Sequence, residues 1–489
     1  MVPTLFLFIK RPTGGDREVV DIMLFNSIAF LLFFPLVCAV YFALPSLRIR
    51  NLFLLAASYY FYMNWQPVYA LLLLTSTVIT YLAALGIGYF EERAKKRLCL
   101  VASLVLNLSI LFFFKYYNFA AMNLSVFLEA FGWAVDFPRF DMLLPVGISF
   151  YTFQALGYSI DVYRKVTPVE RNFFTYALFV SFFPQLVAGP IERSTNLLPQ
   201  FKEKHAFCYE DAMAGFRFML WGFFLKLVLA DRCGLYVDAV FNNVAHHDGG
   251  SFLLASLFFP FQIYGDFAGY SLVAIGVARV MGFRLMENFR RPYFAASVTE
   301  FWRRWHISLS TWFKDYIYIP LGGNRVGNLR CYFNVLVTFV ISGLWHGANW
   351  TFLVWGTLHG ALQCVERMFG FHRARWSGFA RFLHVFVTFC VVSLAWVFFR
   401  ANSLSDALTI LGEIFTNMAM PYLRLADFMA IAIALSVLFA KEGIDEFGWQ
   451  VRISESPVWS VRHLYMVAMI AYILLFGVLN GDQFIYFQF

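Results

Sequence analysis

Residues 23–44 read MLFNSIAFLLFFPLVCAVYFAL, a run without a charged side chain. A helix that crosses the hydrocarbon core of a bilayer needs about 20 predominantly apolar residues. Runs of the same kind recur along the whole chain, and the candidate spans cover residues 24–45, 51–64, 67–90, 98–117, 142–160, 172–190, 212–231, 251–281, 331–345, 347–365, 379–399, 425–440 and 461–480. We expect a multi-pass membrane protein with about ten to thirteen spans, the shortest runs being re-entrant or buried inside the protein.

The composition supports a membrane protein and excludes several other classes. Of the 489 residues, 60% are hydrophobic and only 14% are charged, against about 25% charged in soluble domains. A soluble enzyme, a disordered scaffold and a secreted disulfide-rich module are therefore excluded. The net charge of +8 lies in short loops between apolar runs, so it indicates membrane topology and predicts no nucleic-acid partner.

The basic loops predict the orientation of the chain. Arg48 and Arg50 follow the first span, a cluster lies at 93–97, and another pair lies at 164–165. Placing these loops in the cytoplasm puts the N-terminal end of the first span on the far side of the membrane. Residues 1–22 mix charges with a short apolar run and do not resemble a cleaved signal peptide. We expect them to be an N-terminal extension to a single transmembrane domain, 23–489.

The segment 297–314, SVTEFWRRWHISLSTWFK, is both aromatic and basic. Ser297 and Glu300 have the spacing of a capping box at a helix start. At helical spacing one face is apolar, with Phe301, Trp302, Trp305, Leu309, Trp312 and Phe313, and the other is polar, with Thr299, Arg303, His306, Ser310 and Lys314. This pattern predicts one amphipathic helix, which either lies in the headgroup plane as an anchor or lines a water-filled funnel.

His346 lies in a long apolar stretch, FVISGLWHGANWTFLVWGTLHG (339–360). Ionisable groups at membrane depth are costly and commonly functional, and imidazole is the usual general base near neutral pH. The alternative is a histidine packed between helices with its hydrogen bonds satisfied. His359, as a neighbouring or packed residue, and Asp266, paired with an arginine or orienting a histidine, are secondary candidates.

Other kinds of active site find no sequence support. The seven cysteines are scattered without a C-x-x-C pair, and no H-E-x-x-H or comparable ligand cluster is present, so we expect no disulfide and no metal site. The serine-hydrolase pattern G-x-S-x-G is absent as well.

The motifs together resemble the membrane-bound O-acyltransferase family, in its bacterial branch that O-acetylates exopolysaccharide and peptidoglycan. The resemblance is carried by TEFWRRWHISLSTWFKDYIYIPLGGNR (299–325), SGLWHGANWTFLVWGTLHG (342–360), LLPVGISFYTFQALGYSIDVYR (143–164), FFPQLVAGPIER (182–193), DFAGYSLVAIG (266–276), MGFRLMENF (281–289) and the terminal FIYFQF. It covers nearly all of the chain from Met23.

This resemblance implies an all-α fold, a ring of transmembrane helices around a thin central core with funnels from both faces. It implies that His346 is the catalytic histidine and that His306 occupies the second active-site position. The implied reaction transfers an acetyl group from a cytoplasmic donor, acetyl-CoA, to a hydroxyl beyond the bacterial inner membrane. No tightly bound cofactor is expected, and a periplasmic acetyltransferase and a polysaccharide acceptor are the implied partners.

Several points stay open from the sequence. His346 acts as a general base with His306 as a polarising or proton-relaying partner, or an acetyl-histidine forms. Arg303 and Arg304 contact either an anionic donor or lipid phosphates, with the lipid anchor preferred; no donor-binding residue is assigned. The rival functions are transfer of D-alanine or another acyl group, a transporter or flippase, and a non-catalytic scaffold of a polysaccharide secretion complex.

Overall fold

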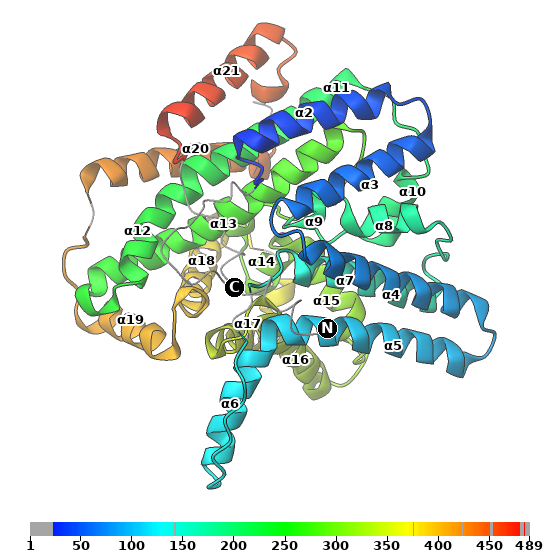
Figure 1. Ribbon diagram of the computed structural model, residues 1–489. Coiled ribbons are helices and arrows are strands. Elements are labelled where there is room, and N and C mark those ends of the chain that lie inside the picture. Colours follow the sequence, from blue (N-terminus) through cyan, green and yellow to red (C-terminus); the bar gives the residue numbers. More distant parts are fainter. Residues whose placement is uncertain are drawn as a thin grey trace. The chain divides into compact units, whose positions relative to one another are not determined.

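The computed structural model describes residues 23–140, 143–374, 376–422, 424–449, 453–479 and 484, and all the regular secondary structure of these residues is helical (Figure 1). The predicted all-α class is therefore confirmed. The N-terminal extension, 1–22, and most of the terminal motif, 485–489, lie outside the described residues.

Within the described ranges, six helical segments are long and apolar enough to cross a membrane: Tyr69–Tyr89, Arg93–Glu129, Tyr209–Phe241, Gly249–Val280, Gly378–Arg400 and Trp459–Phe476. This is fewer than the ten to thirteen runs expected from the sequence. The difference has a structural reason in the runs 142–160 and 172–190. They form α7 (Ile148–Tyr163), α8 (Phe173–Ser181) and α9 (Phe183–Leu186), which are short and mostly buried, as allowed where protein replaces lipid.

The described chain divides into two compact units. The first holds residues up to Gly215 together with Val277–Met286. Its helices, besides α7 to α9 and the start of α11, are α2 (Ile28–Ala43), α3 (Leu47–Met63), α4 (Tyr69–Tyr89), α5 (Arg93–Leu111), the π-helical turn η1 (Phe112–Tyr116), α6 (Tyr117–Glu129) and α10 (Ser194–Gln200). The predicted spans 51–64 and 67–90 correspond to α3, which ends at Met63, and α4, which begins at Tyr69.

The second unit holds Phe216–Gly276 and Glu287–Phe489. Its helices are the remainder of α11 (Tyr209–Phe223), η2 (Phe224–Ala230), α12 (Asp231–Phe241), η3 (Val244–His246), most of α13 (Gly249–Val280), η4 (Pro292–Phe294), α14 (Val298–Arg304), α15 (Ile307–Phe313), η5 (Lys314–Tyr318), α16 (Asn328–His346), α17 (Trp350–Met368), η6 (Phe371–Arg373), α18 (Gly378–Arg400), α19 (Leu404–Thr416), α20 (Leu425–Phe447), η7 (Ile453–Glu455) and α21 (Trp459–Phe476). It contains both predicted histidines.

Helices α16 and α17 form a tight antiparallel pair. The short connection between them directly follows His346, the last residue of α16. The side chain of Asn349 caps α17 by accepting a hydrogen bond from the Thr351 amide. Gly343 and Gly356 face each other across the pair: a Cβ on Gly356 would lie 2.3 Å from the Phe339 carbonyl oxygen. Glycine is therefore required for the two backbones to approach this closely.

We predict that Gly356→Ala forces α16 and α17 apart and destabilises the protein by about 1–3 kcal/mol, the usual cost of overpacking. The matched control is Gly412→Ala on α19, where a Cβ would meet open space and alanine favours the helix by up to about 1 kcal/mol. Thermal unfolding in detergent should give a lower apparent Tm for the first variant only. Equal Tm values for the two variants would contradict the close approach.

Candidate active site

The predicted amphipathic helix 297–314 is interrupted in its middle. Helix α14 ends at Arg304 and α15 begins at Ile307. Between them His306 has φ 43° and ψ 56°, in the left-handed region, where a residue with a Cβ is strained. The prediction of one continuous helix is therefore wrong.

The interruption is explained by a segment that follows α13. The amide of Arg290 donates to the Arg304 carbonyl (2.8 Å), and the amide of Ile307 donates to the Asn288 carbonyl (2.9 Å). The Asn288 side chain also accepts from the Ser308 amide (3.3 Å), so it caps the start of α15. These bonds pair backbone groups that a continuous helix would have paired internally.

The start of α14 confirms the predicted cap in part. The Ser297 hydroxyl accepts from the Glu300 amide (3.0 Å), as expected. The Glu300 carboxylate accepts from the Ala296 amide (2.8 Å). A second carboxylate, Glu366 on α17, accepts from the Val298 and Thr299 amides (2.5 and 2.8 Å). Negative charge at a helix start is stabilising, so Glu366 ties α14 to α17.

The structure confirms the predicted apolar face of the segment but not the whole of its predicted polar face. The apolar face is confirmed, because all six of its side chains are buried. On the polar face Arg303 and Lys314 are exposed, but His306 is completely buried. The polar position expected for His306 is therefore wrong, because the turn at the interruption directs it away from the side expected for a regular helix.

His306 lies among aromatic and amide groups. Its Nδ1 is 3.1 Å from the Asn288 Oδ1, and its ring centroid lies 4.6 Å from that of Phe267 and 6.0 Å from that of Trp345. Burial lowers the pKa of His306 well below its usual range. Burial therefore favours the neutral form of this imidazole.

His346 is the last residue of α16 and is 3% exposed. Its ring is surrounded by the rings of Trp345 (4.9 Å), Trp355 (5.0 Å) and Phe399 (5.3 Å). Trp345 also contacts His306, so the structure brings the two predicted site residues, from α16 and from the junction of α14 and α15, into one aromatic cluster.

The two secondary candidates have different surroundings. His359 is fully buried and its Nδ1 accepts a hydrogen bond from Trp302 Nε1 (3.2 Å). Its ring also contacts Trp355, which contacts His346. Asp266 is paired with Lys226 (2.6 Å), which also binds Asp231 (2.7 Å). Asp266 is therefore paired with a lysine and not with the expected arginine.

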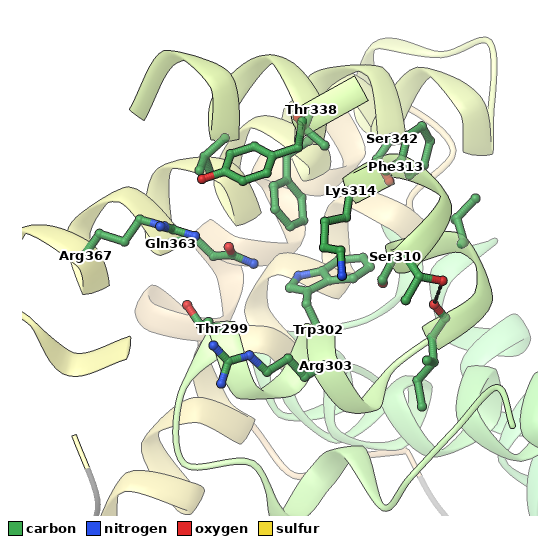
Figure 2. Close-up of a pocket in the computed structure, with 16 residues that line it drawn as sticks. Thr299, Trp302, Arg303, Ser310, Phe313, Lys314, Thr338, Ser342, Gln363 and Arg367 are labelled. Carbon is green, nitrogen blue, oxygen red and sulfur yellow. Dashed lines mark hydrogen bonds between the residues drawn. The ribbon is translucent and has the colours of Figure 1, made fainter. Parts of the chain in front are cut away.

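A cavity of about 480 Å³ lies between α14, α15, η5, α16 and α17 (Figure 2). Thr338 and Ser342 line it from α16, and successive steps of four residues from Thr338 lead through Ser342 to His346 along one helix face. Ile307, which also lines it, directly follows His306. The cavity thus extends to within about one helical turn of both histidines.

Basic side chains surround this cavity. Arg303, Lys314 and Arg367 line it from three different elements, and the polar side chains of Thr299 and Gln363 lie among them (Figure 2). None of the described residues that line it carries a carboxylate. The cavity therefore suits an elongated anionic ligand that has polar groups along its length. Among the described residues, no three His, Cys, Asp or Glu side chains gather into a metal site.

Arg304, adjacent to Arg303, is held in ion pairs within the protein. Its guanidinium forms two hydrogen bonds to Glu446 on α20 (both 2.9 Å) and one to Glu300 (2.6 Å). Glu446 also binds Arg291 and Arg381 (both 2.8 Å). Burial raises the pKa of Glu446, but hydrogen bonds from Arg304 and Arg291 outweigh it and hold the pKa below its ordinary value. Arg304 is therefore a structural residue.

Asn288 is the site residue that sequence reasoning missed. It lies in MGFRLMENF (281–289), but nothing in its local pattern distinguishes it from other polar residues in a turn. Its partners Ile307 and Ser308 are about 20 residues away in sequence. Only the folded chain indicates its role.

Comparison with known proteins gives a consistent family. Residues 164–405 match the model of the MBOAT, membrane-bound O-acyltransferase family. A probable alginate O-acetylase of Pseudomonas putida is 37% identical over 96% of this chain and 100% of its own length. A peptidoglycan O-acetyltransferase of Helicobacter pylori is 38% identical over 80% of each chain. A teichoic acid D-alanyltransferase of Streptococcus thermophilus is 32% identical over 44% of this chain and 55% of its own.

We predict that Glu446→Gln destabilises the protein by about 3 kcal/mol, because three arginines lose their shared buried carboxylate. Since the folded-state pKa of Glu446 is lowered, this stabilisation is present above the ordinary carboxylate pKa and is lost as pH falls below it. The Tm difference between wild type and variant should therefore narrow in acid. The control Glu92→Gln breaks an exposed pair with Lys95 and should change stability by less than about 1 kcal/mol. A Tm for Glu446→Gln equal to that of the control would contradict this role.

Proposed function

The chain belongs to the membrane-bound O-acyltransferase family and is an O-acyltransferase with several apolar, membrane-spanning helices, and on this premise we propose that it transfers acetyl groups across the bacterial inner membrane. The donor is acetyl-CoA on the cytoplasmic side, and the acceptor is a hydroxyl on the far side. The product is an O-acetylated exopolysaccharide of the alginate type, with the cell wall as the second choice. The long matches to a probable alginate O-acetylase and to a peptidoglycan O-acetyltransferase support this proposal.

The single observation that carries the mechanism is the aromatic cluster that His306 and His346 share, about one helical turn from residues that line the cavity. His346 acts as the general base. It takes the proton of the acceptor hydroxyl while the oxygen attacks the thioester carbonyl, a C–O bond forms, and the C–S bond then breaks. His306 polarises the reacting groups or relays the proton, which finally resides on the departing thiol.

An acetyl-histidine relay is the alternative chemical route. In that route an imidazole nitrogen attacks the thioester, the thiol leaves, and the acetyl group then passes from the nitrogen to the acceptor hydroxyl. The aromatic wall of the cluster limits access of bulk water to either reaction. Both routes use the same two histidines, so trapping of an acetylated enzyme in the absence of acceptor separates them.

The donor enters through the basic cavity. The phosphate groups of CoA bind near Arg303, Lys314 and Arg367, and the pantetheine arm extends past Gln363 and Ser342 toward His346. We therefore assign Arg303 to donor binding, whereas the guanidinium of Arg304 is already bound to Glu446 and Glu300. This assignment reverses the lipid-anchor role that sequence reasoning preferred for Arg303.

The partners follow from the family resemblance. A periplasmic acetyltransferase receives the acetyl group and completes its delivery to the polymer, so the immediate acceptor hydroxyl is on that partner or on the polysaccharide itself. The chain resides in the inner membrane as a multi-pass protein. Transfer of D-alanine is the second candidate reaction, and the shorter match to a teichoic acid D-alanyltransferase supports it less.

We predict that His346→Ala and His306→Ala each lower acetyl transfer by about 10²- to 10⁴-fold, the usual contribution of a positioned acid or base. The assay uses liposomes with radiolabelled acetyl-CoA on one side and polymer with the periplasmic partner on the other. The control is His463→Ala, whose ring hydrogen-bonds within its own helix, to the Trp459 carbonyl, and which should retain activity.

Full transfer by His346→Ala would refute its assignment as the base. Wild-type protein that transfers D-alanine from a carrier protein, but no acetyl from acetyl-CoA, would establish the second candidate reaction. If labelled acetyl groups reached neither the periplasmic partner nor the polymer, although the folded protein and partner were present, the result would favour a transporter or scaffold.

We predict that Arg303→Gln raises the KM for acetyl-CoA about tenfold and leaves kcat and Tm nearly unchanged, because a charge-assisted phosphate contact contributes roughly 1–2 kcal/mol. The control is Lys95→Gln, an exposed cation on α5. The KM for acetyl pantetheine, which lacks the nucleotide phosphates, should not change in Arg303→Gln. An unchanged KM for acetyl-CoA would remove this residue from the donor site.

A further inference from the structure

Asn288 makes an unusually complete set of contacts around His306. Its side chain is 1% exposed. Its Oδ1 lies 3.1 Å from His306 Nδ1, 2.9 Å from Ser308 Oγ and 3.3 Å from the Ser308 amide nitrogen. Its Nδ2 donates to Ser271 Oγ on α13 (3.1 Å). Every polar atom of the side chain therefore has a partner.

The Ser308 backbone amide determines which way the Asn288 side chain points. A backbone N–H can only donate, so the Asn288 atom that faces it must be the carbonyl oxygen. The same oxygen faces His306 Nδ1. An oxygen that only accepts requires a donor there, so Nδ1 of His306 carries a proton.

The tautomer of His306 follows from this arrangement. A neutral imidazole has one N–H, and Nδ1 holds it, so Nε2 has the lone pair. The Ser308 hydroxyl agrees with this assignment: it donates to Asn288 Oδ1, and its oxygen lies 3.4 Å from Nδ1, where it can accept. The opposite tautomer would place a nitrogen lone pair against the Asn288 oxygen.

We propose that Asn288 is a positioning residue that fixes His306 in the Nδ1–H tautomer and in its left-handed backbone conformation, so that Nε2 is the nitrogen that exchanges a proton during transfer. The catalytic use of Nε2 rests on the proposed function, whereas the tautomer and conformation rest on the hydrogen bonds alone. In enzymes that use imidazole as a base, the group bound to the other ring nitrogen sets which nitrogen reacts.

The backbone contribution of Asn288 is separate from that of its side chain. Its carbonyl accepts from the Ile307 amide, and two residues later Arg290 binds the Arg304 carbonyl. These two bonds bracket His306. They hold the residue in a conformation that would otherwise be strained, so side-chain substitutions at 288 should disturb the tautomer more than the path of the chain.

Other ionisable groups on the surrounding elements do not replace this role. Asp266 on α13 is paired with Lys226, and Glu287 is paired with Arg290. The other titratable or charged groups on these elements are Tyr264, Tyr270 and Arg279 on α13, Arg291 beside Phe289, Glu300, Arg303 and Arg304 on α14, and Arg330, Cys331, Tyr332 and His346 on α16. Asn288 Oδ1 and Ser308 Oγ are the polar atoms that face Nδ1 of His306.

The tautomer can be measured without an activity assay. Protein labelled with ¹⁵N-histidine in lipid bilayers is examined by solid-state NMR, and His306→Gln identifies the His306 signals by difference. We expect a protonated Nδ1 and an unprotonated Nε2 in the wild type, and a mixture of tautomers in Asn288→Ala. An unprotonated Nδ1 in the wild type would overturn the proposal. An unchanged tautomer in the folded Asn288→Ala variant would do the same.

Kinetics test the consequence for the reaction. We expect Asn288→Ala to lower kcat about 10- to 100-fold at unchanged KM for acetyl-CoA. Asn288→Asp keeps the accepting oxygens and should recover much of kcat at high pH. Its carboxylate stabilises the imidazolium, so the pH at which His306 becomes doubly protonated rises, and the acid limb of the kcat profile moves to higher pH.

The matched control is Asn107→Ala, which removes another buried asparagine that accepts from Ser76 and donates to the Ser103 carbonyl. It should lower Tm without moving the acid limb. Equal pH profiles for wild type and Asn288→Asp would overturn the positioning role. If His306→Ala kept full activity and the wild type showed the expected NMR tautomer, the catalytic use of Nε2 would be refuted. The structural inference would then remain intact.

Discussion

The hydrogen bonds between the segment 288–290 and the turn at 304–307 are the constraint on which the site depends. Without them the sequence from Ser297 to Lys314 would continue as a single helix, because its aromatic residues recur at helical spacing throughout. The bonds from Arg290 and Ile307 remove two backbone groups from that helix. The chain turns at His306 as a result, and a ring expected on the polar face becomes buried beside Trp345.

In this aromatic cluster the two histidines are kept apart from the charged side chains. Formal charges near it are confined to ion pairs, such as Glu446 with its three arginines, or to the cavity lined by Arg303, Lys314 and Arg367. Both histidines lie among indole and phenyl rings, where a cation is poorly solvated. A neutral imidazole is therefore favoured within the aromatic cluster, whereas the basic side chains that line the cavity favour a negatively charged ligand.

Sequence reasoning predicted the features that depend on local pattern. The Ser297 cap and the apolar face of 297–314 each follow from residues a few positions apart, whereas the all-α class was implied by the family resemblance. His346 was singled out because an ionisable residue in an apolar run is costly. The features that it missed depend on partners distant in sequence: Asn288 meets Ser308, Asp266 meets Lys226, and Arg304 meets Glu446. Arg303 and Arg304 are adjacent in the sequence, and it is the ion pairs of Arg304 with Glu300 and Glu446 that distinguish them in the structure.

The choice of an amide at position 288 has a physical reason. A carboxylate would orient the imidazole equally well, as in many histidine sites, but it would also place a negative charge in a cluster of aromatic rings. That charge would favour the imidazolium form, in which His306 has no lone pair to accept a proton. An amide oxygen accepts the Nδ1 proton without this effect. Asn288 therefore orients the ring and, at the same time, leaves it neutral, which is the state that the proposed proton exchange requires.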